Sequence, residues 1–96
     1  MAFISVIIPL FNKQTFIKKT LQSVLDQTFI DFEVILVNDG STDASVDIVN
    51  SFNDERITLF STPNMGVSHA RNDGISKSNS ECITFLDADD LWETNH

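Results

Sequence analysis

Short apolar runs alternate with longer amphipathic segments along the chain. Four apolar runs predict strands, at residues 3–8, 32–37, 57–60 and 82–86. Three amphipathic segments predict helices, at residues 14–26, from a cap at Ser41 or Thr42 to about residue 53, and at residues 67–77. We expect Pro9 to end the first strand, and Gly74 is a weak point inside the last helix.

This alternation of strands and helices predicts an α/β fold built from βαβ units. Right-handed crossovers would place all four strands parallel in one open sheet. Ligands of such sheets bind outside the carboxyl ends of the strands, where the strand order reverses. Three polar segments follow strands at this edge: the residues after Pro9, Asn38 with Asp39, and residues 87–90. We therefore expect these segments to share one crevice.

The composition indicates one small, acidic domain. The chain has 96 residues, of which 42% are hydrophobic, so a packed core is expected. Six basic residues stand against fourteen acidic ones, and the net charge of −8 argues against nucleic acid or an anionic membrane as the partner. A nucleotide remains compatible with this charge, because a metal ion or one arginine can neutralise a diphosphate locally.

Cysteine content and hydropathy predict a soluble, cytoplasmic protein. Cys82 is the only cysteine, which excludes an internal disulfide and makes a reducing compartment the simpler assumption. Because Cys82 falls in an apolar run, we expect it to be a core residue. The first residues lack the basic start of a signal peptide, and no segment reaches the length of a transmembrane helix.

The most informative polar segment is the acidic cluster at residues 85–90, which reads FLDADD. It places Asp87, Asp89 and Asp90 directly after a predicted strand, where three like charges repel one another. A divalent cation removes this conflict, and Mg²⁺ or Mn²⁺ often binds through one or two carboxylates plus substrate phosphates. A helix cap is the structural alternative, but one aspartate suffices for that. The cluster therefore favours a metal–phosphate site.

Other candidate residues carry weaker signals. Asp39 either accepts hydrogen bonds from a nucleobase or ribose, or forms a turn with Gly40, which would supply a positive φ or a close backbone approach. Arg71 either pairs with a phosphate, steadies Asp39, or makes a weak surface ion pair. His69 is expected on a helix surface. Trp92 is either a lid over the cleft or a core residue.

Several segments occur in the order and spacing of a known family. They are residues 5–12 (SVIIPLFN), 34–43 (VILVNDGSTD), 64–72 (NMGVSHARN) and 85–90 (FLDADD), with residues 21–28 (LQSVLDQT) fitting its first helix. Together they resemble the N-terminal, nucleotide-sugar-binding half of a family 2 glycosyltransferase. The resemblance covers residues 1–96 and implies a Rossmann-like GT-A half-domain with three α/β/α layers. It also implies inverting transfer from a nucleotide-diphosphate sugar, with a UDP-sugar expected, and Mg²⁺ or Mn²⁺ as cofactor.

The resemblance further implies how the nucleotide is bound. The backbone after Pro9 would lie along the base. Phe11 stands where the family often has tyrosine, so stacking is expected without a hydroxyl group. Asp39 would hold uracil or ribose, and Arg71 would lie beside the nucleotide.

A metal site and a catalytic base would complete the implied enzyme. Asp87 would contact ribose or the metal, and Asp89 would ligate the metal that bridges the phosphates. Family members also have an acceptor-binding region, for a saccharide or a lipid-linked glycan, and a later carboxylate base. We therefore expect a truncated domain whose base lies beyond the chain end, although Asp90 and Glu93 could act as bases by chemistry alone.

Two hypotheses from other classes stand beside this one. A half-domain would leave a strand edge and apolar surface uncovered, so a non-catalytic, self-associating module is the second hypothesis. A flavodoxin-like phosphoacceptor domain is disfavoured, because it would need its acidic cluster near the first strand, and that strand is followed by Pro9 without a carboxylate.

Overall fold

The computed structural model describes residues 4–26, 31–78, 80 and 82–89. These residues form one parallel, four-stranded sheet in the order β3-β2-β1-β4. The strands are β1 (Ile4–Leu10), β2 (Phe32–Asp39), β3 (Ile57–Thr62) and β4 (Cys82–Phe85). The helices are α1 (Ile17–Leu25), α2 (Ser45–Asn50) and α3 (Val67–Lys77). The predicted α/β fold with a parallel sheet is confirmed.

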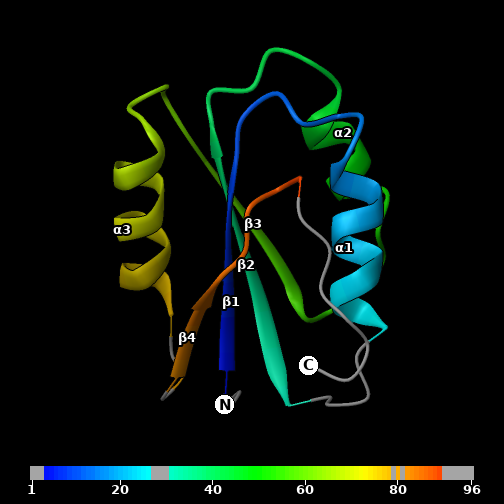
Figure 1. The fold of residues 1–96 in the computed structure, drawn as a ribbon, viewed down its shortest axis with the longest axis vertical. Helices are drawn as coiled ribbons and strands as arrows, with labels where there is room; N and C mark the ends of the chain where they lie inside the picture. The colour runs from blue at the N-terminus through cyan, green and yellow to red at the C-terminus, as the bar shows by residue number, and fades with distance from the viewer. Residues whose placement is uncertain (1–3, 27–30, 79, 81, 90–96) are drawn as a thin grey trace.

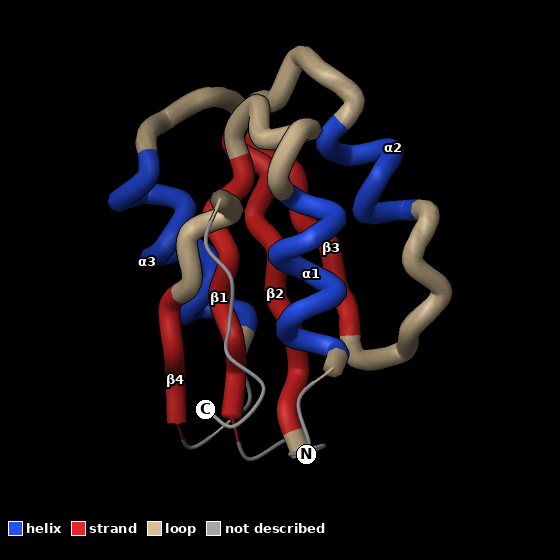
Figure 2. The backbone as a smooth tube through the Cα atoms, turned by 45° about the vertical axis from the view of Figure 1, so that its right-hand side comes forward, coloured by secondary structure: helices blue, strands red, loops and turns tan. Residues whose placement is uncertain are grey.

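The sheet is the middle of three layers (Figures 1 and 2). The helices α1 and α2 cover one face and α3 covers the other, so the predicted α/β/α arrangement is confirmed. Val6, Ile8 and Leu10 of β1 belong to the apolar core beneath α1 and α2. Ile7, between them in the chain, packs with Ala70 of α3. Burial on both faces explains why β1 and β2 are nearly continuous apolar runs.

The chain changes its direction across the sheet at β1. The strands β1, β2 and β3 follow one another outward, after which the chain crosses back and adds β4 on the other side of β1. The strand β1 pairs with β2 along its whole length, but with β4 only as far as the pair Ile7↔Phe85. The carboxyl ends of β1 and β4 therefore flank the switch point at which parallel α/β sheets bind ligands.

Pro9 lies inside β1, so the prediction that it ends the strand is wrong. The carbonyl of Ile7 accepts a hydrogen bond from the N–H of Leu86 at 3.0 Å. Backbone polar groups two residues apart point to the same side of a strand, so the nitrogen of Pro9 also faces the β4 side. Because β4 pairs with β1 only as far as Ile7, a proline removes no hydrogen bond between these strands.

Two of the three helices are shorter than predicted, since α1 begins later and α2 ends at Asn50 and not near residue 53. The helix α1 begins at Ile17 and not at residue 14, because residues 13–16 form a turn closed by hydrogen bonds to the carbonyl of Lys13. The helix α3 has the predicted bounds, and His69 is exposed on it as expected. Within the described ranges, no helix is both long and apolar enough to cross a membrane.

Cys82 is exposed, so the prediction of a core cysteine is wrong. Its strand β4 is at one edge of the sheet, and most of its side chains face solvent. Ile83 and Phe85 of the same strand are 39% and 45% exposed. An apolar run indicates a strand, but it does not show whether that strand is central or at the edge.

Gly74 marks a close approach of α3 to β1. The residue is buried, and a Cβ atom at this position would lie 2.5 Å from Cγ2 of Ile7. Ile7 is itself fully buried, so its branched side chain has little room to yield. The residue that the sequence marks as a weak point in the helix is therefore required for packing.

We expect Gly74→Ala to destabilise the chain by about 1–2 kcal/mol, because overpacking against Ile7, at the upper end of the usual cost of about 1–3 kcal/mol, outweighs the roughly 1 kcal/mol that alanine gains in helix propensity. Urea unfolding followed by circular dichroism measures the change. Ser76→Ala, at an exposed position of the same helix, is the matched control and should change stability by less than about 0.5 kcal/mol. A Gly74→Ala chain as stable as the unaltered one would contradict the close packing.

Candidate functional site

A cavity of about 470 Å³ opens at the carboxyl edge of the sheet. It is lined by residues from the ends of strands and the segments that follow them, namely Pro9, Leu10, Phe11, Lys13, Asp39, Asn64, Gly66, Val67, Asp87, Ala88 and Asp89. The predicted polar segments therefore meet at one crevice. Five of the six residues predicted to bind nucleotide or metal line it, and Arg71 is the exception.

Residues 86–89, called the acidic strap below, run from β4 toward α1 (Figure 1). Their side chains alternate in burial. Leu86 and Ala88 are 9% and 3% exposed, whereas Asp87 and Asp89 are exposed. Both carboxylate residues line the cavity. The spacing of the two aspartates therefore places both of them at the cavity while the residues between and before them are buried.

The acidic strap is anchored by its two buried residues. The N–H of Leu86 donates to the carbonyl of Ile7 in β1 at 3.0 Å. The hydroxyl of Thr20 in α1 donates to the carbonyl of Ala88 at 2.8 Å. These bonds tie the strap to the central strand and to the helix layer on one face of the sheet.

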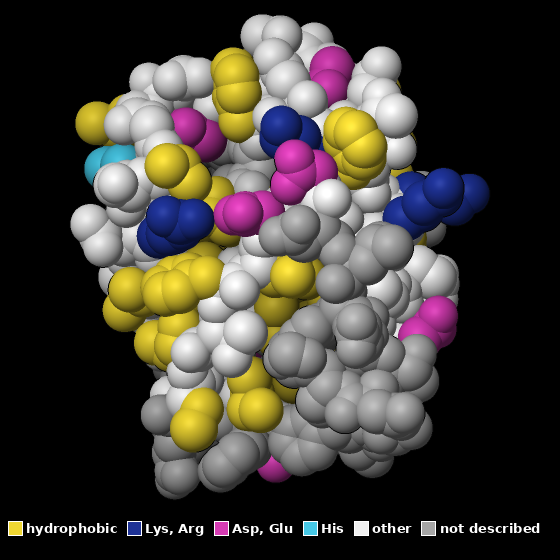
Figure 3. Space-filling model, in the orientation of Figure 1, with side chains coloured by type: hydrophobic (Ala, Val, Ile, Leu, Met, Phe, Trp, Pro, Cys, Tyr) yellow, Lys and Arg dark blue, Asp and Glu magenta, His cyan; other side chains and the backbone are white. Residues whose placement is uncertain are grey.

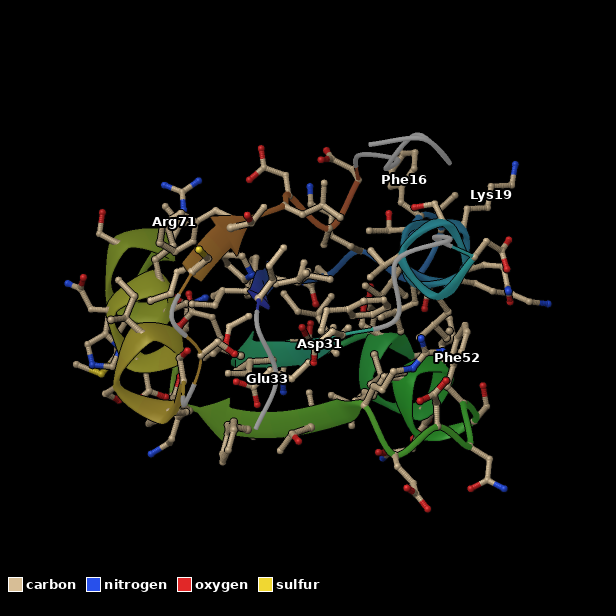
Figure 4. All side chains as sticks on the ribbon, turned by 90° about the horizontal axis from the view of Figure 1, so that it is seen from below. Phe16, Lys19, Asp31, Glu33, Phe52 and Arg71 are labelled. Atoms are coloured by element: carbon tan, nitrogen blue, oxygen red, sulfur yellow. The ribbon has the colours of Figure 1, made fainter. Side chains whose placement is uncertain are left out.

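Each carboxylate of the strap lies near one basic side chain. Nη2 of Arg71 is 3.4 Å from Oδ1 of Asp87, and the guanidinium lies over the ring of Phe85, 5.8 Å from its centroid. Nζ of Lys13 is 3.8 Å from Oδ2 of Asp89. Acidic and basic side chains adjoin on this face in Figure 3, and Figure 4 shows Arg71 beside β4. Both contacts are long and solvent-exposed, so they are weak ion pairs.

Arg71 makes a weak surface ion pair, which is one of the alternatives offered by the sequence, and Lys13 is a further basic residue at the cavity. Arg71 has Asp87 as its charged partner, in place of the Asp39 that the sequence offered as one alternative. Lys13, which the sequence did not single out, lines the cavity beside Asp89. Its place in the polar segment after Pro9, at the carboxyl end of β1, is the signal that could have identified it.

Asp39 holds the loop in front of α3. Its side chain is buried, with 5% of the residue exposed. Oδ1 accepts the N–H of Met65 at 2.7 Å, and Oδ2 accepts the N–H of Gly66 at 3.0 Å. Such charge-assisted bonds are stronger than those between neutral groups. The sequence did not reveal this role, because the partners lie 26 and 27 residues further along the chain.

Gly40 allows the same loop to come close to β2. Its φ is +75°, in the left-handed region that favours glycine. A Cβ atom would also lie 2.8 Å from the backbone nitrogen of Asn64. Both sequence expectations, a positive φ and a close backbone approach, are therefore confirmed. Because Asn64 lines the cavity, Gly40 shapes one of its walls.

Hydrogen bonds of Asn12 join the loop after β1 to the loop after β2. It adopts a φ of +49°, a conformation that asparagine tolerates better than most residues. Its Oδ1 accepts the N–H groups of Thr42 at 2.7 Å and Asp43 at 3.3 Å, and its own N–H donates to Oγ of Ser41 at 3.0 Å. These hydrogen bonds fix the backbone at Asn12. Its two neighbours in the chain both line the cavity.

Asp43 connects the same two loops to the start of α2 through hydrogen bonds. Its Oδ1 accepts the N–H of Ser45 at 2.9 Å, and its Oδ2 accepts the N–H of Gln14 at 3.1 Å. Burial acts to raise the pKa of Asp43, but the hydrogen bonds from Ser45 and Gln14 outweigh it and hold the pKa below its usual value. The prediction that Ser41 or Thr42 caps α2 is wrong, because Asp43 satisfies its first N–H.

The carboxylates of the strap fit a divalent cation only together with further ligands. Within the described part of the chain, no group of three or more His, Cys, Asp or Glu side chains is placed to hold a metal ion. Mg²⁺ and Mn²⁺ often bind through one or two carboxylates plus substrate phosphates, and Asp87 with Asp89 provides such a pair. The sequence candidates Asp90, Trp92 and Glu93 lie outside the described residues.

We expect Asp43→Ala to lower the free energy of unfolding by about 0.5–2 kcal/mol at neutral pH, since it removes the acceptor at the start of α2. The loss should shrink with falling pH. A carboxylate with a lowered folded pKa stabilises the fold above its unfolded pKa of about 3.9, and this contribution disappears as pH falls through the folded pKa. Urea titrations between about pH 7 and pH 2 measure both effects.

Glu55→Ala is the matched control for this change, because it removes the same charge from an exposed position. Its effect should be below about 0.5 kcal/mol at every pH. A penalty for Asp43→Ala that stays constant down to pH 2 would show that the carboxylate is not the stabilising group.

Comparison with known proteins shows that the chain matches one family of enzymes. The model of Glycosyl transferase family 2 matches residues 5–96 of the chain. An uncharacterized glycosyltransferase of Haemophilus influenzae is 43% identical over 94 residues, which are 95% of this chain and 38% of that protein. Glycosyltransferase GlyA of Streptococcus pneumoniae is 40% identical over 95 residues, 97% of this chain and 14% of that protein. The chain thus spans less than half the length of these relatives.

Solved structures share the fold. S. aureus TarS 1–349 in complex with UDP-GlcNAc has a TM-score of 0.92 at 31% identity, over 96% of this chain and 28% of that one. The mannosyltransferase PcManGT from Pyrobaculum calidifontis, in complex with GDP-Man and Mn²⁺, has a TM-score of 0.86 at 29% identity, over 93% and 28% of the two chains. The Rossmann-like half-domain implied by the sequence is therefore confirmed.

Proposed function

The chain belongs to glycosyl transferase family 2, and on that premise we propose that its cavity binds a nucleotide-diphosphate sugar as the donor of a sugar transfer. Its curated relatives are named glycosyltransferases. The proposed transfer inverts the configuration of the sugar and delivers it to a saccharide or a lipid-linked glycan. The inverting course and the acceptor are supported by the family resemblance alone.

The observation that carries the proposal is the contrast between two sides of the cavity. Pro9, Leu10 and Phe11 supply an apolar side, and the ring of Phe11 is available for stacking because the residue is 42% exposed. Asp87 and Asp89 supply a side suited to a metal-bound diphosphate. A nucleotide diphosphate has the same two parts, since it joins a flat base to a charged diphosphate.

A UDP-sugar is the proposed donor. Structures of S. aureus TarS hold UDP and UDP-GlcNAc, whereas PcManGT holds GDP-Man. TarS is the more similar of the two in both TM-score and sequence identity, and this favours uridine. A titration with UDP and GDP in parallel separates the two nucleotides.

We propose Mg²⁺ or Mn²⁺ as the cofactor, held by Asp89 and Asp87 together with diphosphate oxygens. The Mn²⁺ in the PcManGT complex supports a divalent ion in this fold. When bound, such an ion offsets the charge that develops on the leaving diphosphate. The chain itself contributes the two carboxylates at the cavity, and each of them lies beside one basic side chain.

Asp39 and Arg71 are proposed to bind the nucleotide. Each carboxylate oxygen has two acceptor sites, so Asp39 can hold the loop amides and still accept a base N–H or a ribose hydroxyl. The guanidinium of Arg71 has several donors, of which Nη2 contacts Asp87. Its Nε is buried and has no hydrogen-bond partner among the described residues, so only the outer nitrogens would be able to reach a phosphate.

The acceptor site and the catalytic base are proposed to lie outside the described residues. The carboxylates at the cavity, Asp39, Asp87 and Asp89, are all assigned to donor binding above. An additional group is therefore needed to remove the proton from the acceptor hydroxyl.

Self-association through β4 is a second candidate function. The strand is at one edge of the sheet, and Ile83 and Phe85 on it are exposed. Unpaired edges with apolar side chains favour pairing with another chain. Light scattering tests it: a monomer at all concentrations would exclude self-association without affecting donor binding.

We expect Asp89→Asn to weaken Mn²⁺-dependent binding of UDP by about 10-fold or more, at least the loss found when supporting residues of a metal site are removed, because it removes a charged ligand of the ion. Asp87→Asn should weaken the same binding. Isothermal titration calorimetry with UDP, in MnCl₂ and separately in EDTA, measures the metal-dependent part.

Asp47→Asn is the matched control, since it makes the same chemical change at an exposed position on α2. It should leave UDP binding unchanged. The proposal would be contradicted if the unaltered chain bound UDP equally well in EDTA, or did not bind UDP or GDP at all.

A further inference from the structure

One buried hydroxyl group joins α1 to the acidic strap. Thr20 is fully buried, and its Oγ1 donates to the carbonyl of Ala88 at 2.8 Å, across 68 residues of sequence. Ala88 is 3% exposed, so water has little access to replace this bond. A buried carbonyl without a donor is unfavourable, and the hydroxyl therefore determines where the middle of the strap lies.

The position of Ala88 controls both carboxylates of the proposed donor site. Asp87 and Asp89 are its two neighbours in the chain, and both line the cavity. The carbonyl of Ala88 shares one rigid peptide plane with the N–H of Asp89. A hydrogen bond that orients this carbonyl therefore also sets the direction in which the chain continues into Asp89.

The ion pairs of the strap are less able to hold it. The Lys13–Asp89 contact is 3.8 Å and the Arg71–Asp87 contact is 3.4 Å, and in each pair both side chains are at least 39% exposed. Exposed pairs of this kind contribute little to a fixed geometry. The Thr20 bond is shorter and buried, so it is the better determinant of strap position.

We propose that Thr20 is a positioning residue of the donor site, one that holds Asp87 and Asp89 where they can share one divalent cation. This inference rests on the proposed function of the cavity. The sequence contains its signal, because Thr20 lies on the buried side of α1 with Ile17, Leu21 and Val24. A hydroxyl on an otherwise apolar helix face requires a hydrogen-bond partner.

The test compares Thr20→Val, which keeps the shape of the side chain but removes the hydroxyl, with Thr20→Ser, which keeps the hydroxyl. Calorimetry with UDP, in MnCl₂ and in EDTA, gives metal-dependent and metal-independent affinities. We expect Thr20→Val to weaken Mn²⁺-dependent UDP binding by about 10-fold or more, the range found when supporting residues of a metal site are removed. Binding in EDTA should not change, and Thr20→Ser should restore the metal dependence.

Amide hydrogen exchange supplies a readout that needs no ligand. In Thr20→Val, the N–H of Leu86 should exchange about 10-fold faster, because the strap opens locally more often. The N–H of Leu36, in the buried strand β2, is the internal reference and should keep its rate. Thr20→Ser should keep both rates.

The outcomes separate the two proposals. Equal Mn²⁺-dependent affinity for UDP in Thr20→Val and the unaltered chain would overturn the positioning role and leave the proposed function standing. Faster exchange of Leu36 together with Leu86 would show general unfolding and would also overturn the role. Absence of Mn²⁺-dependent UDP binding in the unaltered chain would overturn the proposed function, and the role of Thr20 with it.

Discussion

The geometry of the cavity depends on β1 being one of the two inner strands, paired on both sides and buried on both faces. Because both neighbours run parallel to it, the segments that follow β1, β2 and β4 emerge at the same edge of the sheet. Because β4 pairs with β1 only as far as Ile7, the last residues of β1 have no strand from the described part of the chain on that side. Pro9 and Leu10 line the cavity as a result. The short pairing of one strand thus provides the space for the site.

The charge of the chain and the charge of the proposed ligand have the same sign. With a net charge of −8, the chain as a whole repels a nucleotide diphosphate. The local arrangement offsets this repulsion, since Lys13 and Arg71 lie beside the two carboxylates of the strap. The carboxylates themselves can attract the ligand only through a cation. Metal dependence is therefore the property on which the donor assignment relies most.

The sequence was sufficient where a residue's environment is local or periodic, and insufficient where it depends on distant partners. Apolar runs located β1 and β2, and helical spacing located most of α1, because burial repeats along each element. The place of Pro9 depends on how far β4 pairs with β1, and the exposure of Cys82 depends on β4 being an edge strand. Asp39 was selected correctly as a cavity residue, but its amide partners are 26 and 27 residues away. Periodicity contains no information about such contacts.

The alternating burial along the acidic strap also limits how position 88 can vary. The proposed metal binding uses the side chains of the two aspartates and not that of the residue between them. The fold does restrict the residue at position 88, because that residue is 3% exposed and its carbonyl accepts a hydrogen bond from α1. A large side chain there would have to displace its packed neighbours. The packing around position 88 therefore restricts it to a small residue, although neither aspartate requires this.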